Sequence, residues 1–383
     1  MKSAEILKFS LFLILLLVLV SSFPLIQDFI SIKSFIIDNK FSDEVNSIIS
    51  TVDGGYLLTG QSTLISDENF IEIIKLDEKM TVQWSRSFNY SMKNFGVKGI
   101  QAFDDGYIIL GYARSNEGRR DSQIIVLKLS LGGVVEWTFT YSTGFYVKPY
   151  DISSLHEVSY ILVGFEETSV YGDSNILVLN IGSNGSLIWE RRFGYPYDDR
   201  GVSVVSNSDG FYVVGTSEAF EGSNIILLKM SNAGEIEWDK EYSGSNFDCA
   251  VKIFHTQDSG LVIVGSRARG TVILLMKLDS DGSVTNEEEI DIAPVTIVNS
   301  VVMTPSNHLV LTGYIVEVKS TPQLFILKLD EDFNQLKKKI IRTTNGQKGI
   351  DIVHISGNKY VIVSKRRPLM SQGEDIVLIA LTI

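Results

Sequence analysis

The sequence predicts an all-β protein, a seven-bladed β-propeller of four-stranded antiparallel blades closed by an N-terminal strand. The first observation is a hydrophobic strand that recurs seven times and ends on a small residue, at intervals of 51, 53, 51, 50, 48 and 51 residues. The second is that strand and turn patterns alone fill each interval, which at a period near 50 is typical of a propeller. No helical pattern competes after residue 30. The closing residues of the seven strands are Gly60, Gly111, Gly164, Gly215, Gly265, Gly313 and Ser364.

Two further strands follow each closing residue in the first six units. A second apolar strand such as FIEIIKLD or NIILLKMS comes after a loop, and its β-branched residues favour a strand over a helix. A tight turn then leads to a third strand, which carries Trp84, Trp137, Trp189 or Trp238 at the same position in units one to four. Asn286 and Lys337 replace the tryptophan in units five and six. We interpret the tryptophans as packing residues of outer strands.

The seventh unit lacks its last strand, because the chain ends at Ile383 just after the second apolar strand. An unassigned apolar segment, Ile32 to Ile37, precedes the first complete unit. We expect this segment to supply the missing outer strand and to close the ring, which removes exposed strand edges. A closed ring cannot be divided, so residues 32–383 are predicted to form one domain, with residues 23–31 as a linker.

The first 22 residues have the pattern of an export signal. Lys2 and Lys8 precede an apolar run from Leu11 to Val20, which is short for a membrane-spanning helix and fits a secretory signal peptide. An uncleaved N-terminal membrane anchor is the open alternative. Both place the propeller outside the cytoplasmic membrane, extracellular or at the cell surface, with membrane contact only through this segment.

Composition narrows the range of partners. The formal net charge of −12 argues against nucleic acid as a ligand. Cys249 is the only cysteine, so no intrachain disulfide is expected, and we interpret it as a small buried apolar residue. We expect a monomer.

The run from Asp173 to Gly215 carries a family resemblance. It reads DSNILVLNIGSNGSLIWERRFGYPYDDRGVSVVSNSDGFYVVG, and it resembles the β-propeller repeats, SBBP-like and about 50 residues long, of exported bacterial and archaeal surface proteins. The resemblance extends over nearly the whole chain after residue 32. It implies a recognition or scaffolding platform and no particular activity. The repeat's acidic turn residue corresponds to Asp43, Asn94, Asp198 and Asp248, which we interpret as turn caps.

A polar position recurs in the innermost strands and gives the candidate site. One position is always polar while the next is apolar, or glycine once, so the polar position is expected to face water in the central channel. Its charged members Lys98, Asp151, Lys252 and Asp351 are the candidate ligand-binding residues, for a small polar ligand. The alternative is a solvated channel in which lysine and aspartate compensate each other, as exposed pairs worth about 0 to 1 kcal/mol. The seven polar residues are Ser47, Lys98, Asp151, Ser203, Lys252, Ser300 and Asp351.

Loops on one face form a second, less specific candidate. They carry cations such as Arg114, acids such as Glu166 and Glu167, and aromatic residues such as Tyr146. A face of this kind could hold a protein or a glycan, and ordinary solvated loops are the alternative.

No motif of catalysis or metal binding is present in the sequence, which contains no GxSxG, HExxH or P-loop pattern. The turn from Asp279 to Gly282 resembles a calcium loop, but Lys277 would take the place of the first ligand, so a hairpin turn is favoured. His255 and His354 share one inner-strand position on separated blades and do not make a metal site alone. We therefore predict no catalytic residue, no metal and no cofactor.

These observations favour an exported, non-enzymatic propeller that acts as a surface recognition or scaffold module for protein or glycan ligands. The alternative is a propeller enzyme, a hydrolase, lyase or quinone-dependent dehydrogenase, with its site at the mouth of the central channel. Asp151 or Asp351 would then be the acid or base, and Lys98 or Lys252 would stabilise charge.

Overall fold

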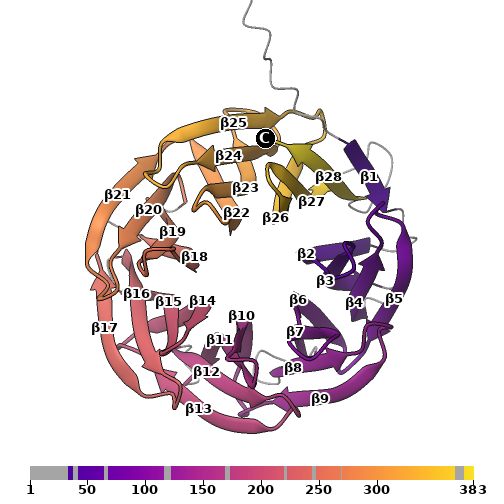
Figure 1. The fold of residues 1–383 in the computed structure, drawn as a ribbon, viewed down its shortest axis with the longest axis vertical. Helices are drawn as coiled ribbons and strands as arrows, with labels where there is room; N and C mark the ends of the chain where they lie inside the picture. Colours follow the sequence, from indigo (N-terminus) through magenta and orange to yellow (C-terminus); the bar gives the residue numbers. More distant parts are fainter. Residues whose placement is uncertain are drawn as a thin grey trace, which may run out of the picture.

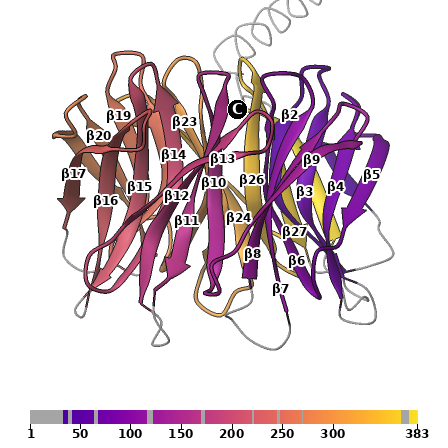
Figure 2. The same cartoon turned by 90° about the horizontal axis from the view of Figure 1, so that it is seen from below.

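The computed structural model describes residues 33–37, 42–63, 68–115, 122–168, 173–219, 222–243, 247–268, 270–366 and 375–383. These residues form a ring of seven four-stranded antiparallel sheets around a central channel, and the innermost strand of each sheet faces the channel (Figure 1). Seen from the side, the strands run between two faces that carry the loops (Figure 2). The predicted seven-bladed β-propeller is confirmed. The predicted signal or anchor at residues 1–22 and the linker at 23–31 lie outside the described ranges.

In every blade the strands follow one another from the channel outwards. Blade one has β2 (Ser42–Ser50), β3 (Tyr56–Thr63), β4 (Asn69–Leu76) and β5 (Val82–Phe88), and blade two has β6 (Lys93–Gln101), β7 (Tyr107–Arg114), β8 (Ser122–Leu129) and β9 (Val135–Tyr141). Blade three has β10 (Val147–Leu155), β11 (Ser159–Glu167), β12 (Ser174–Gly182) and β13 (Leu187–Phe193), and blade four has β14 (Asp198–Asn207), β15 (Gly210–Ala219), β16 (Gly222–Ser231) and β17 (Ile236–Tyr242). Blade five has β18 (Cys249–His255), β19 (Leu261–Arg267), β20 (Val272–Leu278) and β21 (Val284–Ile290), and blade six has β22 (Val295–Met303), β23 (Leu309–Val316), β24 (Gln323–Leu329) and β25 (Gln335–Ile341). Blade seven has β26 (Gln347–Ser356), β27 (Lys359–Arg366), β28 (Asp375–Thr382) and β1 (Lys33–Ile37).

The two middle strands of each blade form the hydrophobic core. They are buried on both faces because each blade packs against its two neighbours, and this explains their almost continuous Val, Ile and Leu runs. Ile161 and Val163 of blade three, for example, share one core cluster with Phe211 and Val213 of blade four. The outer strands consist almost entirely of exposed and half-buried residues. The core therefore lies between blades and not within them.

The tryptophans of the outer strands join blades one to four each to the blade that follows. The indole N–H of Trp137 donates to the Ser183 carbonyl at 2.8 Å, and a Cβ added at Gly185 would lie 2.8 Å from the same ring. Gly185 has φ of +80°, a conformation that glycine adopts without strain. The other three tryptophan rings pack against turn glycines in the same way, Trp84 against Gly133, Trp189 against Gly234 and Trp238 against Gly282. Where blade five has Asn286 instead of tryptophan, the turn of blade six has Phe333 instead of glycine, at φ of +69°.

The outer strand of blade seven comes from the N-terminal part of the chain. β1 pairs antiparallel with β28, from Lys33 opposite Ala380 to Ile37 opposite Ile376. This is the position that the sequence predicts for the segment from Ile32 to Ile37. That the pairing keeps the ring closed is a prediction, taken up in the Discussion.

The turn caps are partly as predicted. The Asn94 side-chain oxygen accepts from the backbone N–H of Tyr90 at 2.8 Å, as a cap should. In blade four the equivalent residue is Asp199, which accepts from the N–H of Tyr195 at 2.5 Å. Asp198 was the predicted cap, and this prediction is wrong, since its carboxylate accepts from the Ser174 hydroxyl. The fourth unit is one residue shorter before its closing glycine, so counting back from Gly215 gives the wrong neighbour.

The closing glycines are required by a β-bulge. All seven innermost strands contain a register shift opposite the closing residue. A Cβ added at Gly60 would lie 1.8 Å from the Glu44 carbonyl oxygen, and one at Gly313 would lie 1.9 Å from the Ile297 carbonyl oxygen. The bulge thus brings the innermost strand too close for a side chain.

We expect Gly60→Ala to lower the free energy of unfolding by about 1–3 kcal/mol, because the clash is with backbone that cannot move away. Urea denaturation measures the change. Gly132→Ala is the matched control, since the only atom near its added Cβ is the Ser130 hydroxyl oxygen at 3.9 Å. Equal stability of both variants would contradict the close approach.

Candidate functional site in the central channel

The bulges shape the wall of the central channel. Each bulged residue lines a channel cavity of about 330 Å³ and immediately precedes a member of the polar position. The bulged residues are Asn46, Val97, Tyr150, Val202, Val251, Asn299 and Ile350. The extra residue turns the strand locally, so the polar residue that follows can point towards a neighbouring blade as well as into the channel.

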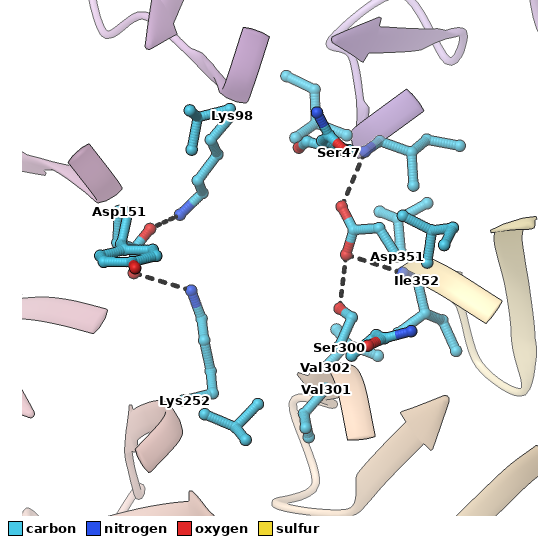
Figure 3. A pocket seen from close by; sticks show the side chains of 18 of the residues that line it. Ser47, Lys98, Asp151, Lys252, Ser300, Val301, Val302, Asp351 and Ile352 are labelled. Carbon is cyan, nitrogen blue, oxygen red and sulfur yellow. Dashed lines mark hydrogen bonds and ion pairs between the residues drawn. The ribbon is translucent and has the colours of Figure 1, made fainter. Parts of the chain in front are cut away.

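Lys98, Asp151 and Lys252 form one cluster on one side of the channel (Figure 3). The Lys252 ammonium nitrogen lies 2.9 Å from Asp151 Oδ2, and the Lys98 ammonium donates to Asp151 Oδ1. Asp151 Oδ2 also accepts from the Ser203 hydroxyl at 2.8 Å and from the Val204 N–H at 3.1 Å. One carboxylate therefore connects blades two, three, four and five.

Asp351 forms a second cluster on the opposite side of the cavity (Figure 3). Its Oδ1 accepts from the Ser300 hydroxyl at 2.5 Å and from the Ile352 N–H at 2.9 Å, and its Oδ2 accepts from the Ile48 N–H at 2.8 Å. These donors come from blades six, seven and one. Asp351 thus connects the two blades that flank blade seven, which holds the C-terminal strands.

The channel residues are more buried than the sequence predicts. Only 3% of the Asp151 side chain is exposed, against 25% for Lys98 and 27% for Lys252. Ser203 is fully buried and does not face water. The expectation that the whole polar position faces water is wrong, because the side chains bond across blade boundaries. The pairs around Asp151 are consequently not exposed ion pairs.

The two carboxyl groups have opposite pKa shifts. Burial favours the neutral form of Asp151, but the charges of Lys252 and Lys98 outweigh it and hold the pKa well below the usual range. Burial raises the pKa of the Asp351 carboxyl, and its hydrogen bonds only partly oppose this. Asp151 is therefore ionised at all ordinary pH values, whereas Asp351 is the more easily protonated group.

The two lysines also differ. Burial and the nearby charge of Lys252 lower the pKa of the Lys98 ammonium, against the attraction of Asp151. Burial opposes the charge of Lys252 as well, but Asp151 and Asp351 raise its pKa. Lys98 is thus the group that would lose its proton first.

Two side chains that sequence analysis missed form further inter-blade contacts. Asn46 donates from its amide to the Gly96 carbonyl at 2.8 Å, and Asn299 donates to the Gly349 carbonyl at 2.6 Å. Both are bulged residues, each followed by serine. The Asn-Ser pair occurs at this position only in units one and six, and that repetition was the available signal.

Buried lysines outside the channel were also missed. The Lys75 side chain is 1% exposed and donates to Asp53 at 2.8 Å and to the Leu76 carbonyl at 2.9 Å. Burial raises the pKa of Asp53, but hydrogen bonds from Lys75 and Thr51 lower it to about 2. Lys128 is paired in the same way with Asp104 in blade two. In blades one and two, the lysine of the second apolar strand therefore fixes the preceding hairpin turn.

The remaining sequence candidates stay apart. His255 packs against Tyr212, and His354 hydrogen bonds to the Gly357 carbonyl at 2.9 Å. No group of three or more potential metal ligands occurs in the part of the chain that the structure describes. Cys249 is half-buried, with its sulfur 3.6 Å from the Ser223 hydroxyl. Over the same residues, no helix has the length and apolar character needed to span a membrane.

The similarity to known proteins is one of fold. Neither a protein-family model nor a curated protein matches the sequence. A Dyadobacter fermentans protein of unknown function is similar in structure with a TM-score of 0.56 and 10% identity, over 92% of this chain and 99% of that one. A Bacteroides uniformis protein, named as a candidate 6-phosphogluconolactonase, gives a TM-score of 0.52 and 11% identity, over 84% of this chain and 94% of that one. At these identities the likeness extends to the propeller fold alone.

Proposed function

We propose that this chain is an exported, non-enzymatic propeller that serves as a surface recognition or scaffold module for a protein or glycan. The observation that carries the proposal is the state of Asp151, whose two oxygens accept from two lysines, a serine and a backbone N–H. A carboxylate with a lowered pKa and occupied lone pairs is a poor proton acceptor. The most buried charged group of the channel is thus suited to holding blades together and not to acid–base chemistry.

The channel wall is the candidate contact for a small polar ligand. Lys98 and Lys252 line the cavity of about 330 Å³ and keep a quarter of their side chains exposed. A ligand with an anionic group would share these lysines with Asp151, and Asp351 lies across the cavity as an acceptor for its hydroxyl groups. The cavity has the size of small-molecule sites, which begin at about 300 Å³.

The test is a binding screen of the purified chain against an array of defined glycans and a panel of surface proteins. We expect binding without turnover of any ligand that is found. The same preparation is assayed with glycosides, a sugar lactone and quinone cofactors. A saturable turnover of any of these would contradict the non-enzymatic assignment.

One observation favours the enzymatic alternative at the channel mouth, namely the raised pKa of Asp351. A protonated carboxyl group in a cavity can act as a general acid. Under this alternative, Asp351→Asn abolishes turnover in a chain that is still folded, as thermal unfolding verifies. Under the recognition proposal the same variant has no activity to lose, so the two proposals separate on the assay of the wild-type chain.

Export is tested by cell fractionation of a strain that expresses the full chain. Because Lys2 and Lys8 precede the apolar run, we expect the propeller outside the cytoplasmic membrane, either released or held by its N-terminal segment. Recovery of the full-length chain in the cytoplasm would overturn this part of the proposal.

A further inference from the structure

A second cavity lies beside the channel, where blades two, three and four meet. Its volume is about 250 Å³, and Tyr150 is the one residue that lines both this cavity and the channel. Its walls come from the end of β7, the first half of β10, the end of β11, and the starts of β12 and β14. The lining consists of Arg114, Lys148, Arg200, Tyr146, Tyr150, Phe165, Glu167, Ser174 and Asp198.

Three cations enter this cavity, and aromatic rings hold them in place. The Lys148 ammonium lies 4.9 Å from the centre of the Tyr150 ring and 5.9 Å from that of Tyr112. The guanidinium of Arg114 lies 5.5 Å from the centre of the Phe95 ring, and that of Arg200 lies 5.7 Å from the centre of the Phe165 ring. Such contacts orient a cation without neutralising it.

Among the residues that the structure describes, two of these cations have no carboxylate partner. Arg200 pairs with Glu218 at 3.2 Å, but within the described part of the chain neither Arg114 nor Lys148 forms an ion pair. Burial, together with Arg200 and Arg114, lowers the pKa of the Lys148 ammonium. The three positive charges repel one another in this half-buried cavity. A bound anion would reduce that repulsion.

The cavity also contains acceptors. Glu167 and Asp198 line the same walls, and Asp198 accepts from the Ser174 hydroxyl at 3.1 Å. A simple inorganic anion would pair with the cations but would give these two carboxylates no hydrogen-bond donor. A ligand that presents one carboxylate together with several hydroxyl groups satisfies both halves of the lining, since charge-assisted hydrogen bonds form at each. The volume limits the ligand to about one ring.

We propose that this cavity binds an acidic sugar residue, the uronate unit of a glycan. The carboxylate lies against Arg114 and Lys148, and the sugar hydroxyl groups donate to Glu167 and Asp198. The exposed surfaces of Tyr146 and Tyr150 provide the aromatic contact that sugar rings favour. The inference rests on the proposed recognition function and names the ligand class and the site.

Isothermal titration of the purified full chain tests the site with trigalacturonate and a hyaluronan tetrasaccharide as probes. We expect at least one of them to bind, and Lys148→Met to weaken it at least tenfold, while Lys148→Arg retains most of the affinity. Lys348→Met is the matched control. Lys348 occupies the position in the innermost strand of blade seven that Lys148 occupies in blade three, and its ammonium also lies 4.9 Å from the centre of an aromatic ring, that of Tyr314. Its affinity should equal that of the wild type.

Thermal unfolding of each variant shows whether it is folded. Absence of binding by both uronate probes, or equal affinity for uronates and for neutral trigalactose, overturns the inference. So does binding that is the same in Lys148→Met as in the wild type. Equal affinity for free glutamate would assign the cavity to small zwitterions instead, and also overturns it. If uronates fail while another glycan or a protein binds in the screen, this inference falls and the proposed function stands; if nothing binds at all, both fall.

Discussion

Replacing Lys98 and Lys252 together by methionine should lower the free energy of unfolding by about 3–5 kcal/mol, the cost of leaving a buried carboxylate without its partners. Asp151 is 3% exposed, and both lysines donate to it. Chemical denaturation of the double variant measures the loss. Each single variant should lose less than half of this, because the remaining lysine still neutralises the carboxylate.

Two controls separate this cause from a general effect of removing lysines. Lys365→Met should cost about 0–1 kcal/mol, since its partner Glu44 is 44% exposed. Adding Asp151→Asn to the double variant should recover at least half of the lost stability, because no charge is then buried. A double variant as stable as the wild type would show that the lysines and Asp151 do not form a cluster in solution.

The double variant also has a distinct response to pH. In the wild type the lysines depress the pKa of Asp151 in the folded state, so their stabilisation is complete above the unfolded pKa of about 3.9 and decreases as the pH falls below it. Without the lysines, burial raises the pKa, and stability then increases as the pH falls through that raised value. As the pH falls through about 4, the stability contributed by this group therefore decreases in the wild type and increases in the double variant, and the difference between the two pH curves reports whether the cluster is present.

Deleting residues 23–39 should destabilise the whole domain, because the deletion removes β1 and leaves β28 as an exposed edge. Every residue of β1 pairs with one of β28, from Ile376 to Ala380, and Ile376 and Leu378 belong to the core cluster shared with blade one. We expect a melting temperature lower by several degrees and a tendency to associate through the open edge. Differential scanning calorimetry and sedimentation measure the two effects.

A deletion of residues 23–31 alone is the control, since it removes the predicted linker and keeps β1. It should melt like the wild type. An unchanged melting temperature after the longer deletion would show that β1 does not close the ring.

The blade count was predictable from sequence because each blade repeats the same physical requirement. The bulge brings the innermost strand against the second strand, so a side chain is excluded at Gly60 and its equivalents, and the glycine recurs with the blade. Ser364 departs from this pattern and is accommodated, because its hydroxyl accepts from Gln347 and donates to the Val377 carbonyl. The same local constraint therefore marks six of the seven blades with a glycine in the sequence.

The candidate site was only partly predictable. The sequence shows that Lys98, Asp151 and Lys252 occupy the same position in their innermost strands. Their contact depends on lysine side chains that extend from blades two and five to the carboxylate in blade three. The alternation of polar and apolar residues predicts on which side of a strand a side chain lies. It does not predict which residue of another blade that side chain contacts. The same limit applies to Arg114 and Lys148, which converge on one cavity from different blades.

The contact between an outer-strand tryptophan and the glycine turn of the next blade has a consequence for how such a chain can be recombined. The natural cutting points of the sequence repeat, at the closing residues, leave Trp137 in one unit and Gly185 in the following one. A unit exchanged at those points would contain a tryptophan but not the glycine turn that contacts it. Its own glycine turn would meet the tryptophan of an unrelated preceding unit. The transferable module is therefore offset from the visible repeat: it begins after one glycine turn and ends with the next, so that each indole travels together with the turn that receives it.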